Sequence, residues 1–588
     1  MGILSVADIR KTLYYFKRNG LKSTLHAAKE RLGSTSASEY KPSHAADSEL
    51  KKQREWSRDK DLLFSIVVPT YRTNEKYLRD MAASVLAQSY PFWELVIADA
   101  TEDGTVEELV KGYGDKRIKY IHLDTNAGIS DNTNRGIEEA KGDYIGLLDH
   151  DDLLEPDLLY EAAYSIYKEP GIKLLYTDED KCDTNAEKYF EPHIKESFNL
   201  DLILSNNYIC HFLLIEAALM KQLKLRREYD GAQDYDLVLR AVSVLKEKEA
   251  QIYHIPKVLY HWRCHMASTA ENPQSKLYAY DAGKRALQAF ADREEYNAVA
   301  SPLKHLGFYT LNYKKDIFEC RPDIGAVGGR ILINNRIAGG RLGKNGELYY
   351  EGLSKNYSGY MHRAVLTQDA EAADIRCIRL RPELQKLFKE TLNITYTEDE
   401  KGMFDVSTLP DCDCTELSLK LSEAVRSAGY RILYSPADNE RSIKPTDKDK
   451  KCNITDNNGK NSPKEKITVV IPNYNGERYL KDCLESLLDE RLVSGTPDFR
   501  VLVIDNGSSD KSAEILEKFA KAVDTIYLNE NTGFCHAVNE GIKAAVSPYV
   551  LLLNKETTVK AGFINALFLA LEKRPEAFSV SSKMLMWD

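Results

Sequence analysis

A passage of apolar runs separated by helical stretches occurs twice in this 588-residue chain, and the repeat restricts the fold more than any other feature. SIVVPTY at Ser65–Tyr71 matches TVVIPNY at Thr468–Tyr474, and Asp99 and Asp505 end the next apolar run of each copy. Further along, NAGI and LLDHD recur as NTGF and LLNKE. Self-similarity in a fixed order indicates two copies of one folding unit.

Within the first copy, short runs rich in β-branched and aromatic residues alternate with helical stretches. The runs FSIVVP, ELVIAD, IKYIHLD and DYIGLLD are interrupted by stretches such as YLRDMAASVLAQ. This rhythm predicts an α/β, Rossmann-like fold, with a mainly parallel sheet and helices on both faces. Ligands of such sheets bind at the carboxyl ends of the strands. We therefore expect functional residues directly after strands.

The chain is long enough for about three or four packed domains. We predict an N-terminal helical segment over 1–60, a complete α/β domain over 61–300 and a partial repeat over 301–436. A linker rich in Asp, Asn, Lys and Ser, without aromatic residues, should occupy 437–465. The first half of the second copy then covers 466–588.

The partial repeat opens with RPDIGAVGGRI at Arg321, and RPEAFSVSSKM at Arg574 resembles it. Two arrangements explain this: a truncated tandem, or halves that pair in permuted order. The permuted arrangement predicts one compact domain over 321–588. We favour truncation because both segments include the RP motif and therefore overlap.

Composition excludes some partners. The net charge of −10 and the pI near 5.8 leave no general basic surface for nucleic acid.

No apolar run reaches the ~18 residues needed to span a bilayer, and the chain does not start like a signal peptide. We therefore expect a cytoplasmic protein. Residues 9–32 are basic with apolar residues at helical spacing, which is typical of a peripheral contact with the inner face of the cell membrane or of a docking helix.

An acidic triplet, Asp149-His150-Asp151, follows a predicted buried strand. Alternation along an extended chain places Asp149 and Asp151 on one face, where they can share a hard divalent cation such as Mg²⁺ or Mn²⁺. Such a cation neutralises charge on a departing diphosphate. By itself the triplet is weak evidence, since a turn or a helix cap that begins at Asp152 is commoner.

The context of the triplet strengthens the metal hypothesis. Pro69-Thr70-Tyr71 and Asp99 follow neighbouring strands, so a stacking ring, a carboxylate for a base and the acidic triplet share one sheet edge. Here the chain resembles the family 2 glycosyltransferases of the GT-A fold, over residues 64 to about 270. Further motifs come in the expected order: YTDEDK at Tyr176, NNYICH at Asn206, GAQDYDLVLR at Gly231 and HIPKVLYHWRCHMAST at His254.

The resemblance implies a role for each matching residue. The donor-binding set would be Pro69, Thr70, Tyr71, Asp99, Asp149, Arg263, His265 and Ser268. Asp151 would ligate the metal together with Asp149 and His261, with His265 as the alternative histidine. Residues that would face the acceptor are Asp178, Glu179, Asp180, Lys195 and His211, although each could equally be an ordinary surface or ion-paired residue.

Asp234 occupies the place of the family's catalytic base, and Gln233 stands where many members have Glu. Direct displacement at an anomeric carbon needs one carboxylate to take the acceptor's proton, and one base without an enzyme nucleophile implies inversion. The alternative for Asp234 is an N-cap of the helix that follows, a role that Asp236 could also fill.

Taken together, the resemblance implies a metal-dependent inverting glycosyltransferase. It would use Mn²⁺ or Mg²⁺ to transfer a sugar from a nucleotide-sugar, UDP by default, to a saccharide or lipid-linked saccharide in cell-surface polysaccharide synthesis. A sugar nucleotidyltransferase would need a Gly- and Arg/Lys-rich loop, which PTYRTNEKY does not supply. A non-catalytic nucleotide-sugar or glycan-binding scaffold is the alternative, and it fits 301–588 better than the first domain.

The second copy departs from the first at the acidic triplet. Asn554-Lys555-Glu556 replaces it, in a segment that resembles rhamnosyltransferase-like members of the same family. A lysine beside the metal position opposes cation binding. Metal binding by the second copy is therefore doubtful.

Overall fold

The computed structural model divides the chain into two compact units, Met1–Lys444 and Pro445–Asp588. The described residues are 15–20, 23–24, 26–27, 30, 40, 42–264, 277–409, 414–443, 466–493, 496–520, 522–545, 547–560, 562–572 and 579.

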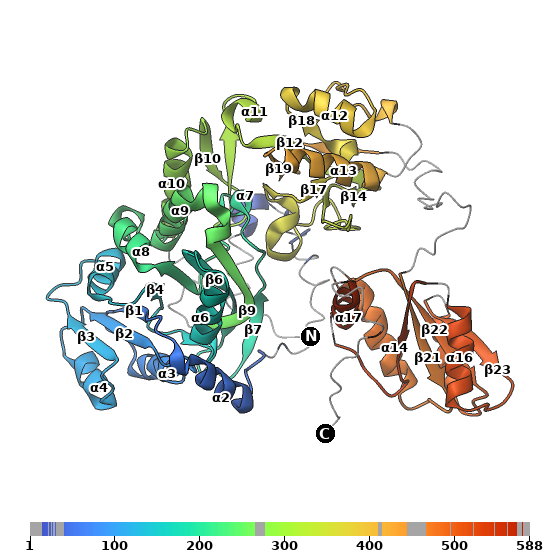
Figure 1. The fold of residues 1–588 in the computed structure, drawn as a ribbon, viewed down its shortest axis with the longest axis horizontal. Coiled ribbons are helices and arrows are strands. Elements are labelled where there is room, and N and C mark those ends of the chain that lie inside the picture. The colour runs from blue at the N-terminus through green and yellow to red at the C-terminus, as the bar shows by residue number, and fades with distance from the viewer. Residues whose placement is uncertain are drawn as a thin grey trace. The chain divides into compact units, whose positions relative to one another are not determined.

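The first unit begins its main sheet with four parallel strands, in the spatial order β3-β2-β1-β4 (Figure 1). Apolar side chains pack helices against both faces, with α5 on one face and α3 and α4 on the other. The elements are β1 (Phe64–Thr70), α3 (Glu75–Leu86), β2 (Trp93–Asp99), α4 (Thr105–Tyr113), β3 (Ile118–His122), α5 (Ile129–Glu139) and β4 (Tyr144–Leu147).

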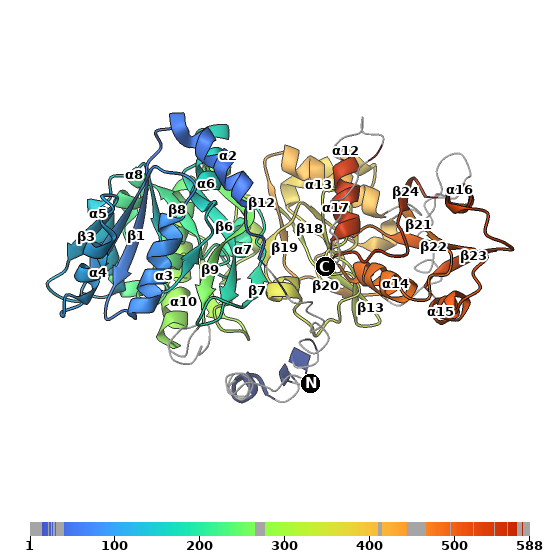
Figure 2. The same cartoon turned by 90° about the horizontal axis from the view of Figure 1, so that it is seen from below.

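The same sheet continues with strands of mixed direction (Figure 2). Strand β8 is antiparallel to both β4 and β6, whereas β6 and β9 run parallel. The elements are β5 (Leu153–Leu154), α6 (Leu158–Lys168), β6 (Leu174–Cys182), β7 (Tyr189–His193), α7 (Leu200–Ile203), β8 (Leu213–Glu216), α8 (Ala217–Leu223), α9 (Gln233–Leu245), β9 (Ile252–Arg263) and α10 (Leu277–Arg293). The expected α/β fold is thus confirmed, with a mixed rather than a mainly parallel sheet.

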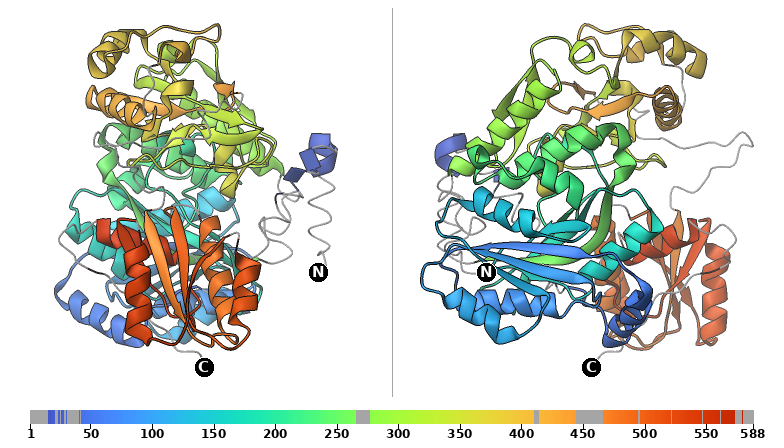
Figure 3. Two further views of the ribbon diagram at one scale, coloured as in Figure 1. Left: turned by 90° about the vertical axis from the view of Figure 1, so that its right-hand side faces the viewer. Right: turned by 60° about the vertical axis from the view of Figure 1, so that its left-hand side comes forward.

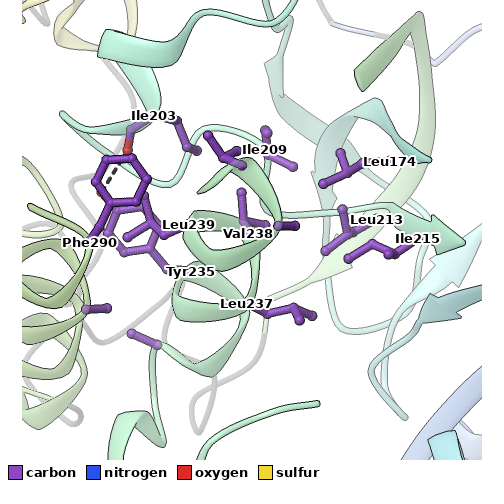
Figure 4. Close-up of a cluster of buried hydrophobic side chains, with 14 of the residues drawn as sticks. Leu174, Ile203, Ile209, Leu213, Ile215, Tyr235, Leu237, Val238, Leu239 and Phe290 are labelled. Atoms are coloured by element: carbon purple, nitrogen blue, oxygen red, sulfur yellow. Dashed lines mark hydrogen bonds between the residues drawn. The ribbon is translucent and has the colours of Figure 1, made fainter. Parts of the chain in front are cut away.

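Helix α9 is held in place by one apolar cluster (Figure 4). Leu237 and Val238 are fully buried and belong to the same cluster as Leu213 and Ile215 of β8. At the first turn, the hydroxyl of Tyr235 donates to the carbonyl of Ile203 at 2.7 Å. The start of α9 is therefore fixed relative to the sheet.

The segment after α10 forms a hairpin, a smaller sheet of four strands in the order β16-β19-β12-β18, and two further short sheets, β14-β13-β20 and β15-β17. The elements are β10 (Ala298–Pro302), β11 (Tyr309–Tyr313), α11 (Ile317–Cys320), β12 (Ile324–Gly328), β13 (Arg330–Ile333), β14 (Arg336–Gly339), β15 (Arg341–Leu342), β16 (Gln368–Asp369), β17 (Ala372–Ala373), β18 (Arg379–Leu380), α12 (Gln385–Leu392), α13 (Cys414–Ser427), β19 (Arg431–Tyr434) and β20 (Glu440–Ser442). Strand β20 pairs with β13, inside the stretch that the sequence predicts as linker. Residues 444–465 lie outside the described residues.

The smaller sheet repeats the second half of the main one. Strand β12 lies between antiparallel β18 and parallel β19, as β6 lies between antiparallel β8 and parallel β9. Helix α13 precedes β19, as α9 precedes β9. Strand order and direction are therefore alike in the two segments.

The smaller sheet is joined to the main domain by buried charge pairs. Arg321, which is fully buried, contacts both carboxylate oxygens of Asp201 at 2.8 and 3.0 Å. Arg341 similarly contacts Glu196 at 2.8 and 3.1 Å. These contacts explain why residues up to 444 form one unit. The boundary between the two compact units falls at residues 444 and 445.

Described parts of the N-terminal segment dock on the first unit. Arg18 donates to the carbonyl of Leu303 at 2.9 Å, and Glu30 accepts from the backbone N–H of Ser358 at 2.9 Å. In α2 (Asp47–Trp56), Trp56 packs against tyrosines of α6. These contacts support the docking alternative, and membrane contact through 9–32 stays a prediction. No helix in the described ranges is long and apolar enough to cross a bilayer.

The second unit repeats the parallel half of the main sheet, in the order β23-β22-β21-β24. The left panel of Figure 3 shows its strands side by side between helices. The elements are β21 (Ile467–Asn473), α14 (Leu480–Asp489), β22 (Phe499–Asn506), α15 (Ser512–Phe519), β23 (Asp524–Leu528), α16 (Phe534–Ala544), β24 (Tyr549–Leu552) and α17 (Phe563–Glu572).

Replacing Arg321 with Ala should destabilise the first unit by about 3 kcal/mol, because the carboxylate of Asp201 is then buried without its partner. Chemical denaturation followed by tryptophan fluorescence measures the change. Lys315→Ala is the matched control, since its ion pair with Glu319 is exposed and should contribute little. An equal loss in both variants would contradict this account of Arg321.

Candidate active site

A buried carboxylate lies where β1 and β2 end side by side. Thr70 and Asp99 are paired in the parallel register of the two strands. Asp99 is fully buried and accepts from the Thr70 hydroxyl at 2.8 Å, the Thr101 N–H at 3.1 Å and the Tyr120 hydroxyl at 3.0 Å. These bonds fix the orientation of a carboxylate, whose two oxygens offer about four lone-pair positions to hydrogen-bond donors such as a base N–H.

Next to this carboxylate the chain presents an aromatic ring. Pro69 and Thr70 end β1, and Tyr71 follows with a half-open side chain that is 36% exposed. The guanidinium of Arg72 lies 5.0 Å from the centre of the Tyr71 ring. The structure thus brings the predicted nucleoside-binding residues together at one sheet edge.

Three carboxylates gather directly after β4. Ligand atoms of Asp149, Asp151 and Asp152 lie within 4.8 Å of one another. Asp152 is fully buried, and burial together with repulsion by Asp151 and Asp149 raises its pKa well above the ordinary value. Oxygen ligands at this spacing fit a hard divalent cation, which would offset the repulsion. The acidic loop is therefore a plausible cation site by its chemistry, and Asp152 is neither an exposed turn residue nor a helix cap.

Asp152 anchors the acidic loop to strand β9. It accepts hydrogen bonds from the Tyr260 hydroxyl and, at 2.7 Å, from the Arg263 N–H. This leaves Asp149 and Asp151, which are half-buried, as the carboxylates that would hold the cation.

Arg263 lies under the acidic loop, with a fully buried side chain. Its guanidinium donates to the carbonyl oxygens of Asp151 at 2.6 Å and Thr184 at 2.7 Å, and to the carboxylate of Asp80 at 3.1 Å. In this arrangement Arg263 fixes the backbone of the loop. The predicted contact with a diphosphate stays a prediction.

His261 lies on β9 between two carboxylates. Its Nδ1 lies 2.6 Å from Asp180 and its Nε2 lies 2.6 Å from Glu155, so both ring nitrogens already face carboxylates. Burial lowers the pKa of His261, but the two hydrogen bonds outweigh burial and raise the pKa to about 9. The described contacts of His261 are thus to protein carboxylates, and the metal contact that the resemblance implies stays a prediction. His265 and Ser268 lie outside the described residues.

Most of the predicted acceptor-side residues form a buried ion-pair network. Asp178 contacts His254 at 2.8 Å, and Glu179 contacts Lys195 at 3.3 Å and His193 at 3.2 Å. Burial alone would raise the pKa of Glu179, but Lys195 and His193 hold it below the ordinary value.

Four of the residues predicted to face the acceptor are therefore buried and ion-paired in this structure: Asp178, Glu179, Asp180 and Lys195. His211 is different, since it is half-buried and stacks on Tyr260 with ring centres 4.7 Å apart.

Two aspartates in the first turn of α9 have different surroundings. Asp236 is buried and bound by Arg226 at 3.0 Å and Arg240 at 2.9 Å, so its charge is neutralised. Asp234 is half-buried and accepts a hydrogen bond, 2.8 Å long, from the side-chain amide of Asn207. Ala232 is the N-cap residue, so neither aspartate fills the N-cap position.

Asp234 belongs electrostatically to the same site as the acidic loop. Burial raises its pKa above the ordinary value, His211 lowers it, and the charge of Asp149 raises it again. The orientation of Asn207 is fixed, because its Oδ1 accepts from the Cys210 N–H at 3.3 Å and its NH₂ group therefore faces Asp234. The site thus combines a buried carboxylate at a strand edge, a cluster of three aspartates and, at the start of α9, an aspartate that has no Lys or Arg ion pair among the described residues.

Sequence reasoning missed several residues that hold the site together: Tyr120, Asp152, Glu155, Asn207 and Tyr260. Asn207 lies in the NNYICH motif and Asp152 in the DHDD run, so both were visible as motif members. Their partners are distant in sequence, and no spacing rule connects them.

Comparison with known proteins agrees with this geometry. The model of the family "Glycosyl transferase family 2" matches residues 65–222 and 468–584. An uncharacterised protein of Sinorhizobium fredii is 41% identical over 230 residues, and the O-antigen biosynthesis protein RfbC of Myxococcus xanthus is 34% identical over 245 residues. These matches cover 38% and 41% of this chain, but only 25% and 19% of the two relatives.

A shorter relative is covered more fully. The putative colanic acid biosynthesis glycosyl transferase WcaA of Escherichia coli is 32% identical over 207 residues, which are 33% of this chain and 72% of that protein. Among solved structures, S. aureus TarS in complex with UDP-GlcNAc is 22% identical, with a TM-score of 0.33 over 39% of this chain and 66% of that one. The assignment rests on the sequence matches. The chain belongs to glycosyl transferase family 2, so its enzyme class is that of the glycosyltransferases and the expected GT-A fold class is confirmed.

The two hydrogen bonds of His261 to carboxylates predict that the free energy of unfolding depends on pH. Its pKa is raised from 6.5 to about 9, so its stabilising contribution is complete below about pH 6.5 and is lost as the pH rises through about 9. We expect the free energy of unfolding to fall over this range in the wild type. His261→Gln should lack this fall; denaturation at pH 6, 7.5 and 9 measures both, and parallel curves would refute the assignment.

Proposed function

We propose that the first domain transfers a sugar, with inversion, from a nucleotide-sugar to a saccharide or lipid-linked saccharide hydroxyl, with Asp234 as the catalytic base. The observation that carries this proposal is the contrast at the start of α9. The charge of Asp236 is neutralised by two arginines. The carboxylate of Asp234 has no arginine partner among the described residues, and the charge of Asp149 acts on it. A base needs such an uncompensated carboxylate within reach of the acceptor.

The reaction is a direct displacement. The acceptor oxygen forms a bond to the anomeric carbon while the bond from that carbon to the diphosphate oxygen breaks, and the acceptor's proton passes to Asp234. The nucleoside diphosphate leaves with the bonding electron pair. Since no enzyme nucleophile takes part, the anomeric configuration inverts.

The donor would lie along the edge formed by the ends of β1, β2 and β4. Asp99 would accept from the base, and Tyr71 would stack on it. Asp149 and Asp151 would hold Mn²⁺ or Mg²⁺, which when bound offsets charge on the departing diphosphate. Arg263 and Asp152 would keep these carboxylates in place.

Relatives suggest the biological setting. RfbC of Myxococcus xanthus is named for O-antigen biosynthesis and WcaA of Escherichia coli for colanic acid biosynthesis. We therefore propose a role in the synthesis of a cell-surface polysaccharide, with UDP-sugar as the first donor to test. TarS has been solved with UDP-GlcNAc, and a mannosyltransferase of Pyrobaculum calidifontis with GDP-Man and Mn²⁺, at TM-scores of 0.33 and 0.30.

Asp234→Asn should lower the transfer rate by about 10²- to 10⁴-fold and leave donor binding unchanged, because the amide cannot take a proton. Steady-state transfer and donor titration measure the two quantities separately. Near-normal turnover in this variant would show that another group is the base.

Asn207→Ala should act through Asp234. The amide of Asn207 stabilises the charged carboxylate, so its loss should raise the pKa of Asp234 further above its ordinary value and shift the acidic limb of the pH–rate profile upwards. Asn206→Ala is the neighbouring control. An unchanged acidic limb with a lower rate at every pH would mean that Asn207 is needed only for folding.

The donor can be identified by hydrolysis of a panel of UDP-, GDP- and dTDP-sugars with the full chain, in Mn²⁺ and in EDTA. We expect metal-dependent release of one nucleoside diphosphate. Absence of both turnover and nucleotide binding would favour the non-catalytic scaffold. For residues 301–588, the scaffold alternative is supported by Lys555, which stands where the first copy has the middle residue of its acidic triplet.

A further inference from the structure

The second unit reproduces the nucleoside-binding edge of the first domain. Asn473 and Asp505 are paired in the parallel register of β21 and β22, as Thr70 and Asp99 are in β1 and β2. The strand on the other side of β21 is also equivalent, since β24 pairs with β21 as β4 pairs with β1. Corresponding strand ends therefore meet at corresponding points.

The buried carboxylate of this edge is present and held in place. Asp505 is 4% exposed and accepts from the Asn473 amide at 2.7 Å and from the hydroxyl and N–H of Ser508 at 2.6 and 3.2 Å. Tyr474, directly after β21, is 42% exposed, close to the 36% of Tyr71. A carboxylate for a base and a ring to stack on it are thus both retained.

The backbone after the first strand is also repeated. Arg72 and Asn475 have the left-handed φ angles of 48° and 49°. Asn473 Oδ1 is buried without a hydrogen-bond partner in the described structure, although Asn473 itself is 1% exposed. The edge therefore keeps an unsatisfied acceptor beside the carboxylate, where a ligand donor could satisfy it.

The difference lies in the charges after the last strand. Where the first domain has Asp149, His150 and Asp151, the second unit has Asn554, Lys555 and Glu556. The Lys555 ammonium lies 3.0 Å from Glu556 Oε1, and the lysine side chain is only 19% exposed.

The stem of Lys555 crosses the loop that follows β21. A Cβ atom built on Gly476 would meet Lys555 Cδ at 2.9 Å and Asn473 Oδ1 at 2.0 Å. Only glycine leaves room here for the lysine stem and the asparagine amide together. The lysine is therefore placed at the nucleoside-binding edge, and its ammonium contacts the carboxylate that corresponds to the proposed metal ligand Asp151.

The two sites therefore present different charges to a diphosphate. A diphosphate at the first site meets the half-buried carboxylates of Asp149 and Asp151, and binding there needs a divalent cation between these carboxylates and the phosphates. A diphosphate at the second edge meets one carboxylate that is already paired with an ammonium. Within the described part of the second unit, no group of three metal-ligating side chains is found.

We propose that the second unit binds a nucleoside diphosphate without a divalent cation, with Lys555 supplying the positive charge that a metal supplies in the first domain. Asp505 and Tyr474 receive the base, and the Lys555 ammonium turns from Glu556 towards the phosphates. The chain then carries two nucleotide sites of different metal dependence.

The test is a calorimetric titration of the full chain with UDP, and then with GDP, dTDP and CDP, in EDTA and in Mn²⁺. We expect one EDTA-resistant site per chain and a second site that appears with Mn²⁺. Lys555→Met should weaken the EDTA-resistant site at least tenfold, as loss of a charge-assisted hydrogen bond does, and leave the Mn²⁺-dependent site unchanged.

Matched variants keep the result interpretable. Lys560→Met removes an exposed lysine of the same unit and should change neither site. Asp505→Asn should weaken only the EDTA-resistant site, and Asp151→Asn only the Mn²⁺-dependent one; thermal melting verifies that each variant is folded. EDTA-resistant binding that is absent with all four nucleotides, or that is unaffected by Lys555→Met, overturns the proposal. If the wild-type chain shows the EDTA-resistant site but no additional site in Mn²⁺, the result counts against the proposed function of the first domain and not against this proposal.

Discussion

The attachment of the acidic loop to strand β9 is the interaction on which the first site depends. Leu153 and Leu154 pair with β9, and Asp152 is held by the Tyr260 hydroxyl and the Arg263 N–H. A loop with three neighbouring carboxylates would otherwise spread, because the charges repel one another at short range. The buried anchor keeps Asp149 and Asp151 at the end of β4, next to the edge formed by β1 and β2. The positions of Asp149 and Asp151 therefore depend on this anchor.

The sequence predicted the parts of the site that depend on where strands end. Thr70, Asp99 and Asp149 each stand at or just after the end of an apolar run, and parallel pairing brings such positions to one edge. The motif order also led to Asp234, whose partner is an asparagine amide, whereas that of Asp236 is an arginine. Neither inference needed knowledge of side-chain contacts. For the same reason the α/β class was predictable, whereas the antiparallel β8 in the middle of the sheet was not, since no short-range pattern shows strand direction.

The sequence could not show which way residues of β9 and β6 face, or which partners they meet. His261 and Arg263 lie in a motif that suggests metal and phosphate contacts, yet each is surrounded by protein groups. Asp178 and Glu179 lie in a motif that suggests acceptor contacts, yet they are buried against histidines far along the chain. A buried carboxylate needs a partner, and a partner distant in sequence is invisible until the fold brings it close.

The two copies show how one framework can carry different chemistry. The pairing of β1 with β2 and β4 is reproduced by β21 with β22 and β24, and buried apolar side chains from these strands form the core in both. The differences lie in the residues after the strands, where Asn554-Lys555-Glu556 replaces Asp149-His150-Asp151. Packing restricts the strands because a change of volume in a close-packed core is costly, but side chains at a strand end meet few such restrictions. A change of charge there costs the fold little and alters which ligand and which cation the edge can hold.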